Sequence, residues 1–220
     1  MVDYRLAIVI PAYHEEATIF GVAAAAGQFG EVIVVDDCSG DATGAKAAEA
    51  GAIVIRSDTN RGYDGTLSRG FEEAAARGFT HVVTMDADGE HDPAVLGEFQ
   101  RKLCGEGYPL VLGYRARKQR FAEVIMGAWF ALRFGVRDIL CGMKGYDLAL
   151  WRANGGFDHS DSIGTELATS ALRRGIRFAQ VPVPGTRRAD APRFDRRWRA
   201  NMRIFAALMR AMRRDARREG

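Results

Sequence analysis

The sequence has little cysteine and proline, and it lacks the patterns of disulfide-rich, membrane-spanning and secreted proteins. Of 220 residues only 6 are proline and 3 are cysteine, and the cysteines at 38, 104 and 141 form no CxxC pair. Neither a disulfide framework nor a structural zinc site is supported, and a reducing compartment is expected. No apolar run is long enough to span a bilayer, and the N-terminal segment lacks the pattern of a secretory signal.

The charged residues are unevenly distributed along the chain. From Arg187 to Glu219 there are 12 arginines and 4 acidic residues, a net charge of +8, whereas the remaining 19 basic and 24 acidic residues sum to −5. The formal net charge of +3 therefore averages an acidic body and a basic C-terminal segment. Such a segment predicts an anionic partner: a membrane surface, a nucleic acid or a phosphorylated substrate.

With 47% hydrophobic and 27% charged residues, the chain is suited to one globular domain. In its first half, short β-branched runs alternate with segments rich in alanine and glutamate. This alternation predicts an α/β fold, in which βαβ units build a mostly parallel central sheet flanked by helices. The expected strands are 6–10, 32–35, 52–55 and 81–85, and the expected helices are 15–26, 42–50 and 65–77.

The second half is less regular, but no repeat or linker separates it from the first. We therefore predict one domain over residues 1–190, with halves at 1–92 and 93–190, followed by a basic amphipathic helix within 191–220. The expected helices of this half are 92–104, 119–135, 164–174 and 195–217, and the expected strands are 110–112, 142–150 and 176–183.

Two aspartates, Asp86 and Asp88, follow directly after the expected strand 81–85. Alternate positions of an extended segment point to the same side, so both carboxylates face one site. Carboxylates this close repel each other unless a cation lies between them, and Mg²⁺ or Mn²⁺ favours oxygen ligands. The pattern predicts a metal site, and Glu90, His91 and Asp92 extend this polar cluster. Asp92, before a proline, is typical of a helix N-cap, which is the alternative role for acidic residues here.

Acidic residues also follow the first two expected strands, Glu15 after the first and Asp37 after the second. Ligands of parallel α/β sheets bind beyond the carboxyl ends of the strands. Because carboxylates accept hydrogen bonds from a base or a ribose and Tyr13 can stack on a base, this cluster predicts a nucleoside site. No GxGxxG or P-loop pattern occurs, so a dinucleotide or P-loop nucleotide is disfavoured. Arg115 is the candidate for meeting the phosphate charge, with a solvated surface arginine as the alternative.

These motifs together resemble the family 2 glycosyltransferases, and more narrowly their dolichyl-phosphate mannose synthase-like branch, the polyprenyl-phosphate glycosyltransferases. The resemblance covers residues 6–195 in order. It implies a GT-A fold, a nucleotide-sugar donor linked to GDP or UDP, and Mg²⁺ or Mn²⁺. It makes residues 1–92 the nucleotide-sugar-binding half and 93–190 the acceptor half. The matching stretches are 9–15, 33–39, 60–66, 85–93, 112–115, 138–144 and 164–183.

By motif position, the resemblance also implies roles for single residues. Arg115 would meet the phosphates, and Arg193 would belong to a C-terminal loop that closes over the donor or acceptor phosphate. Asp64 stands where relatives often have glycine, and we expect no C-terminal membrane domain of the kind that many relatives carry. The residues that would hold the nucleoside are Pro11, Tyr13, Glu15 and Asp37, and those that would hold the metal and the diphosphate are Asp86, Asp88 and Glu90.

The expected reaction is a single displacement that inverts the anomeric configuration, while metal and arginine stabilise the leaving nucleoside diphosphate. Polyprenyl phosphate at the cytoplasmic membrane face is the leading acceptor, and it hardly needs a base because it is already anionic. A sugar or other hydroxyl is the alternative acceptor, and it needs a carboxylate base, for which Glu166 is the candidate. The other role for Glu166 is a favourable interaction with a helix dipole.

Two helices bear on the acceptor. The helix 121–136 has more apolar circumference than one core-facing stripe requires. In the helix 195–217, apolar residues recur at spacings of 4, 3, 4 and 3 among arginines, which is typical of helices in anionic membrane interfaces. Packing on the domain, or on a second copy in a homodimer, is the alternative. A non-catalytic membrane- or nucleic-acid-binding module would leave Asp86 and Asp88 unexplained, so we expect no nucleic acid partner.

Overall fold

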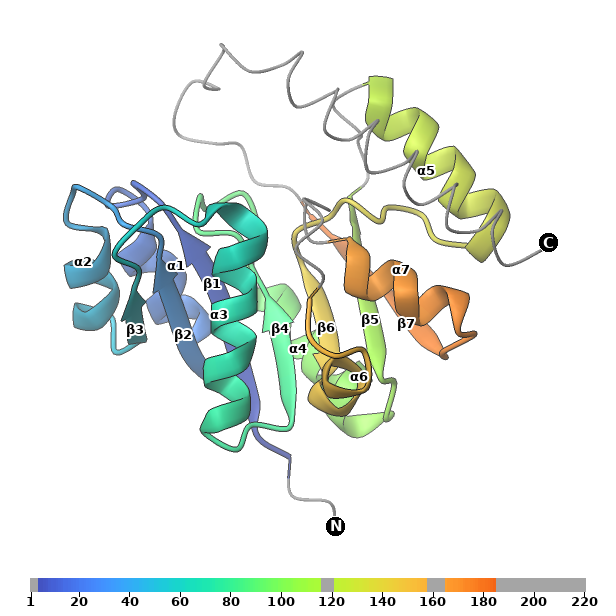
Figure 1. Ribbon diagram of the computed structural model, residues 1–220, viewed down its shortest axis with the longest axis horizontal. Helices are drawn as coiled ribbons and strands as arrows, with labels where there is room; N and C mark the ends of the chain where they lie inside the picture. Colours follow the sequence, from blue (N-terminus) through green and yellow to red (C-terminus); the bar gives the residue numbers. More distant parts are fainter. Residues whose placement is uncertain (1–3, 116–120, 158–164, 185–220) are drawn as a thin grey trace.

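The computed structural model describes residues 4–115, 121–157 and 165–184, which form a sheet with helices on both faces (Figure 1). The described strands make one seven-stranded sheet in the order β3-β2-β1-β4-β6-β5-β7. Their bounds are β1 (Leu6–Ala12), β2 (Glu31–Asp36), β3 (Ile53–Arg56), β4 (His81–Thr84), β5 (Leu110–Arg115), β6 (Lys144–Asp147) and β7 (Phe178–Val183).

The sheet is mostly parallel, as the sequence predicts. β1 lies between β2 and β4 and is parallel to both, and β3 continues the parallel half beyond β2. β6 is antiparallel to its neighbours β4 and β5, while β7 is parallel to β5. The expected α/β class is therefore confirmed, and the carboxyl ends of β1, β2 and β4 meet at one edge of the sheet.

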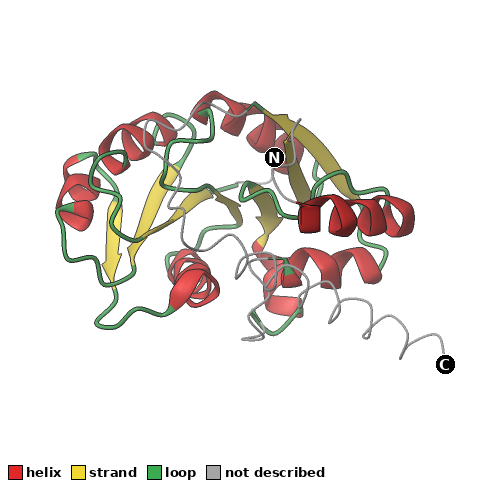
Figure 2. Ribbon diagram, turned by 90° about the horizontal axis from the view of Figure 1, so that it is seen from above, coloured by secondary structure: helices red, strands yellow, loops and turns green. Residues whose placement is uncertain are grey.

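Helices lie on both faces of the sheet (Figure 2). Two apolar clusters fill the space between the sheet and these helices, one on each face. Successive residues of β1 alternate between them, with Val9 in one cluster and Ile8 and Ile10 in the other. This period of two buries both faces of the strand, so its sequence is continuously apolar. The helices α3 (Gly62–Ala76), α5 (Phe121–Phe134), α6 (Leu148–Ala153) and α7 (Glu166–Arg173) contribute to the first cluster; α1 (Ile19–Ala26), α2 (Thr43–Glu49) and α4 (Leu96–Gln100) contribute to the second.

Several element bounds differ from the expected ones. The strand expected at 142–150 is shorter, because the Asp147 side chain accepts a hydrogen bond from the Ala149 amide at 2.7 Å and starts α6. The helix expected at 15–26 begins only at Ile19, and α3 begins three residues early, at Gly62. The helix expected at 92–104 is divided into a 3₁₀ turn (Pro93–Val95), α4 and a π-helical turn (Arg101–Gly105).

Asp92 is the N-cap of that 3₁₀ turn, and its carboxylate accepts from the Ala94 amide at 3.0 Å. The helix N-cap predicted at Asp92 is therefore confirmed. The predicted helix 195–217 and the boundary near residue 190 lie outside the described residues. Within the described residues, every helix is too short or too polar to cross a bilayer.

Candidate active site

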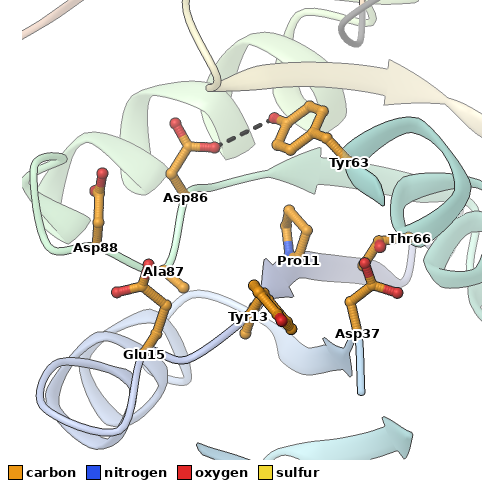
Figure 3. Close-up of a pocket in the computed structure, with 10 residues that line it drawn as sticks. Pro11, Tyr13, Glu15, Asp37, Tyr63, Thr66, Asp86, Ala87 and Asp88 are labelled. Atoms are coloured by element: carbon orange, nitrogen blue, oxygen red, sulfur yellow. Dashed lines mark hydrogen bonds between the residues drawn. The ribbon is translucent and has the colours of Figure 1, made fainter. Parts of the chain in front are cut away.

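A pocket of about 300 Å³ opens at the carboxyl ends of β1, β2 and β4. In the view of Figure 3, Asp86, Asp88 and Glu15 lie on the opposite side of this pocket from Asp37. The structure thus brings together six of the residues that the sequence analysis selected for the donor and the metal. The lining consists of Pro11, Ala12, Tyr13, Glu15, Asp37, Tyr63, Thr66, Asp86, Ala87 and Asp88.

The loop after β1 is held in place by side chains of two other loops. The amide of His14 donates to Ser39 Oγ at 3.0 Å, and the amide of Glu15 donates to Thr43 Oγ1 at 2.9 Å. Thr18 Oγ1 donates to the carbonyl of Ala87 at 2.8 Å, which ties this loop to the one after β4. These bonds fix the separation between the two acidic sides of the pocket.

Backbone strain is concentrated in the same loops. His14 and Cys38, which follow β1 and β2, have φ angles of 56° and 66° in the left-handed region. This conformation is unfavourable for residues other than glycine and persists only where the surroundings enforce it. Tyr13 stands beside His14, with ring centroids 4.3 Å apart in an edge-to-face arrangement, and remains partly exposed on the pocket.

Asp37 organises the entry to α3. Its two carboxylate oxygens accept hydrogen bonds from the backbone amides of Arg61 at 2.7 Å and Gly62 at 2.9 Å. Gly62 has a φ of +71°, a conformation that glycine adopts without strain. Because these two amides occupy one acceptor site on each oxygen, the predicted contact of Asp37 with a nucleoside would have to use the remaining lone pairs.

The Asp86 carboxylate is enclosed from three directions. The Tyr63 hydroxyl donates to Asp86 Oδ1 at 3.2 Å (Figure 3). Nε2 of the buried His91 lies 3.8 Å from Asp86 Oδ2. On a third side, a Cβ atom added at Gly142 would lie only 2.1 Å from Oδ2. Asp86 therefore has one preferred position, set by α3, the loop after β4 and the segment before β6.

Asp88 and Glu90 are joined through the backbone, since Asp88 Oδ1 accepts from the Glu90 amide at 3.0 Å. Glu90 does not line the pocket. Among the described residues, no three His, Cys, Asp or Glu side chains are grouped closely enough to hold a metal by themselves. Of the three predicted metal ligands, Asp86 and Asp88 therefore line the pocket, and the role of Glu90 stays a prediction.

Two further predicted residues lie outside the lining. Arg115 pairs with the buried Asp138, from Nε to Oδ2 at 2.8 Å and from Nη2 to Oδ1 at 3.3 Å. Glu166 is half-buried in the first turn of α7. Burial raises the pKa of Tyr146, and the negative charge of Glu166 raises it further. Arg193 is outside the described residues.

Tyr63 and Thr66 line the pocket but were not selected from the sequence. A signal was available, because both belong to the stretch 60–66 that carries part of the family resemblance. Their side chains reach the pocket only because Asp37 fixes the start of α3, and that contact is not visible in the spacing of the residues.

Comparison with known proteins agrees with this geometry. A family described as "Glycosyl transferase family 2" matches residues 7–145. Undecaprenyl-phosphate mannosyltransferase of Micrococcus luteus is 36% identical over 81% of this chain and 82% of its own length. Polyprenol monophosphomannose synthase of Mycolicibacterium smegmatis is 28% identical over 84% of this chain and 78% of its own.

Among solved structures, glucosyl-3-phosphoglycerate synthase of Mycobacterium tuberculosis superimposes with a TM-score of 0.76. It is 25% identical, the match covers 94% of this chain and 80% of that one, and the complex contains Mn²⁺, uridine diphosphate and glucosyl-3-phosphoglycerate. The expected GT-A fold is thereby confirmed. This chain belongs to glycosyl transferase family 2.

Proposed function

We propose that this glycosyltransferase moves a sugar from a GDP- or UDP-linked donor to polyprenyl phosphate at the cytoplasmic face of a membrane, with inversion at the anomeric carbon. The observation that carries the proposal is the single pocket in which Tyr13, Asp37, Asp86 and Asp88 meet. The names of the two relatives, a mannosyltransferase and a synthase that both act on polyprenyl carriers, support the acceptor. Three free cysteines, Cys38, Cys104 and Cys141, suit a reducing compartment.

In the donor site, Tyr13 would stack on the base, while Asp37 and Glu15 would accept hydrogen bonds from the nucleoside. Pro11 would form the floor between them, because it lies near the end of β1 at the centre of the pocket (Figure 3). The pair with Asp138 holds the guanidinium of Arg115 at the end of β5. We expect Arg115 to meet the diphosphate from this position, because a guanidinium can bind phosphate oxygens through two parallel N–H donors.

The residues present fit a divalent cation of the Mg²⁺ or Mn²⁺ type. Asp86 and Asp88 offer hard oxygen ligands, and such ions are usually held by one or two carboxylates together with substrate phosphates and water. When bound, the cation would neutralise charge on the leaving diphosphate. Asp86 would keep its position through Tyr63 and the close approach of Gly142, so that little rearrangement is needed on binding.

An exposed apolar surface lies on α5. Figure 1 shows this helix beyond the end of β5, at the edge of the sheet where the pocket lies. Met126 and Phe130 are buried, whereas Val124, Ile125 and Leu132 are exposed, Leu132 to 90%. Exposed apolar side chains clustered on one helix favour contact with lipid acyl chains. We therefore propose that α5, with the basic segment after residue 190, holds the enzyme at the membrane surface.

A second acceptor class has its own support. The product bound to the structural neighbour is glucosyl-3-phosphoglycerate, in which the sugar is carried by a small phosphorylated acid and not by a lipid. Transfer to a hydroxyl needs a general base, for which Glu166 is the candidate. Glu166 does not line the pocket, and its charge acts on the buried Tyr146, which favours a structural or acceptor-positioning role.

Glu166→Gln distinguishes these two acceptors. With polyprenyl phosphate we expect turnover within about threefold of the unchanged protein, since removal of a general base would instead lower it by roughly 10²–10⁴-fold. The measurement is the initial rate of transfer from a radiolabelled donor to undecaprenyl phosphate in detergent. Glu73→Gln, on the exposed side of α3, is the matched control. A loss of 10²-fold with intact donor binding would favour the hydroxyl acceptor.

A thermal-shift panel tests the donor and the metal together. The full chain would be heated with GDP-, UDP- and dTDP-sugars, each with and without Mn²⁺. We expect one GDP- or UDP-linked donor to raise the midpoint by about 5 °C at 100 times its dissociation constant, and to do so only with Mn²⁺. A panel in which no nucleotide-sugar changes the midpoint, with or without metal, would overturn the proposed function.

A further inference from the structure

Lys144, the first residue of β6, is a buried lysine that the proposed reaction does not use. It is only 4% exposed, and its ammonium donates a hydrogen bond to the carbonyl oxygen of Cys141 at 2.7 Å. Among the described residues, no carboxylate oxygen lies within ion-pair distance of this ammonium. Lysine is almost never fully buried without a partner, because a desolvated charge is costly. We therefore expect the groups around Lys144 to account for its buried charge.

The surroundings of Lys144 lead directly to Asp86. In the sheet, Lys144 is paired with Thr84, two residues before Asp86, and its amide donates to Thr84 Oγ1 at 3.1 Å. Thr84 Oγ1 in turn donates to the carbonyl of Gly142 at 2.6 Å. Gly142 is the residue whose missing Cβ leaves room for the Asp86 carboxylate. The Lys144 ammonium is thus bonded to the peptide that packs against Asp86, on the side away from Tyr63.

Charges of both signs surround this peptide. Burial lowers the pKa of Lys144, while the neighbouring acidic groups, Asp86 and Asp138 among them, raise it. Asp138 is itself buried and pairs with Arg115. The carboxylates of Asp86 and Asp138 and the cations of Lys144 and Arg115 therefore form a cluster of two negative and two positive charges. The lining carboxylates outside this cluster are Glu15, Asp37 and Asp88.

We propose that Lys144 is a positioning residue that acts as a built-in counter-cation of Asp86, so that the protein alone holds a divalent cation weakly and the donor diphosphate must supply the missing negative charge. This inference rests on the proposed function. A pair of carboxylates with a fixed positive charge nearby attracts a cation less strongly than a bare pair of carboxylates. Lys144 thereby couples metal binding to donor binding.

The test is the affinity for Mn²⁺ alone, measured by isothermal titration calorimetry near neutral pH without nucleotide. Lys144→Gln removes the charge but keeps a donor for the Cys141 carbonyl, and Lys144→Arg keeps the charge. We expect Lys144→Gln to bind Mn²⁺ about tenfold more tightly than the unchanged protein, because a positive charge near the ion is lost. Lys144→Arg is expected to bind Mn²⁺ within about threefold of the unchanged protein, because it keeps the positive charge.

A lysine with a purely structural role would behave in the opposite way, since its replacement would loosen the site and weaken Mn²⁺ binding. Unchanged or weaker Mn²⁺ affinity in folded Lys144→Gln therefore overturns the inference. If that variant does not fold, Lys144→Met provides the test, because it removes the same charge with an unbranched side chain that has no polar group to bury, and an unchanged or weaker Mn²⁺ affinity again counts against the inference. An unchanged protein that binds no Mn²⁺ even with GDP or UDP present contradicts the proposed function itself.

Discussion

Replacement of Asp88 by asparagine is expected to lower the turnover of sugar transfer by roughly 10³-fold, or about 4 kcal/mol of transition-state stabilisation. Asp88 is one of two carboxylates that follow β4 into the pocket, and no third acidic, histidine or cysteine ligand among the described residues completes a metal site around them. Asparagine has the same shape and can still accept the hydrogen bond from the Glu90 amide. The fold should therefore survive while the charge that faces the diphosphate is lost.

The measurement is the initial rate with radiolabelled donor at saturating Mn²⁺, together with the thermal midpoint of each variant. Asp92→Asn is a matched control, because it makes the same substitution four residues later at a helix cap. Asparagine is as good an N-cap as aspartate, so this control should retain its stability and its turnover within about threefold. An Asp88→Asn protein that keeps more than a tenth of the native turnover would remove Asp88 from the reaction.

The parallel half of the fold could be predicted from the sequence because both faces of its strands are buried. The central residues of β1, β2 and β4 are apolar without interruption, because these strands are covered on both faces of the sheet. Each strand can therefore be recognised in the sequence as one short apolar run. The strand predicted at 142–150 is longer than β6 itself. The four residues of β6 lead without a break into α6, and the start of that helix depends on the Asp147 cap. The propensities of Leu148 and Leu150 do not separate a strand from a helix.

The nucleotide and metal side of the pocket could also be predicted, for a topological reason. Glu15, Asp37 and Asp86 follow three strands that are adjacent in the sheet, so their ends meet whatever the intervening helices do. The surroundings of Arg115 could not be predicted in this way. Its partner Asp138 lies in a loop 23 positions further along the chain, and nothing in the local pattern indicates that loop's path.

The same limit applies to the segment 141–144, which encloses Asp86 from the far side. It reaches β4 through antiparallel pairing of β6, a strand whose direction the alternation of strands and helices does not specify. In the sequence, Gly142 and Lys144 belong to the stretch 138–144 that carries part of the family resemblance, but the pattern does not indicate what they contact. Their significance comes from the burial of Lys144 and from the closeness of Gly142 to the Asp86 carboxylate, so their predicted effects test the structure directly.

Gly142→Ala is expected to reduce turnover by about 10²-fold while changing the free energy of unfolding by no more than about 1 kcal/mol. The added Cβ would lie 2.1 Å from Asp86 Oδ2 and 2.6 Å from both Cγ and Oδ1, so the carboxylate must swing away from its position. That movement breaks the hydrogen bond from Tyr63 and displaces the metal-binding oxygens. Because the clash is with the end of a side chain on the pocket and not with the core, activity should suffer more than stability.

Gly145→Ala, three residues later, should show the reverse. Its Cβ would lie 2.6 Å from Leu103 Cδ1 in the core, and such overpacking is expected to cost about 1–3 kcal/mol of stability, while Asp86 is left in place. Gly21→Ala in α1, with no atom within 4 Å of the added Cβ, should leave turnover unchanged. Urea unfolding and turnover per folded molecule would be measured for all three variants. Equal losses of turnover in Gly142→Ala and Gly145→Ala would show that backbone packing, and not the position of the Asp86 carboxylate, limits the reaction.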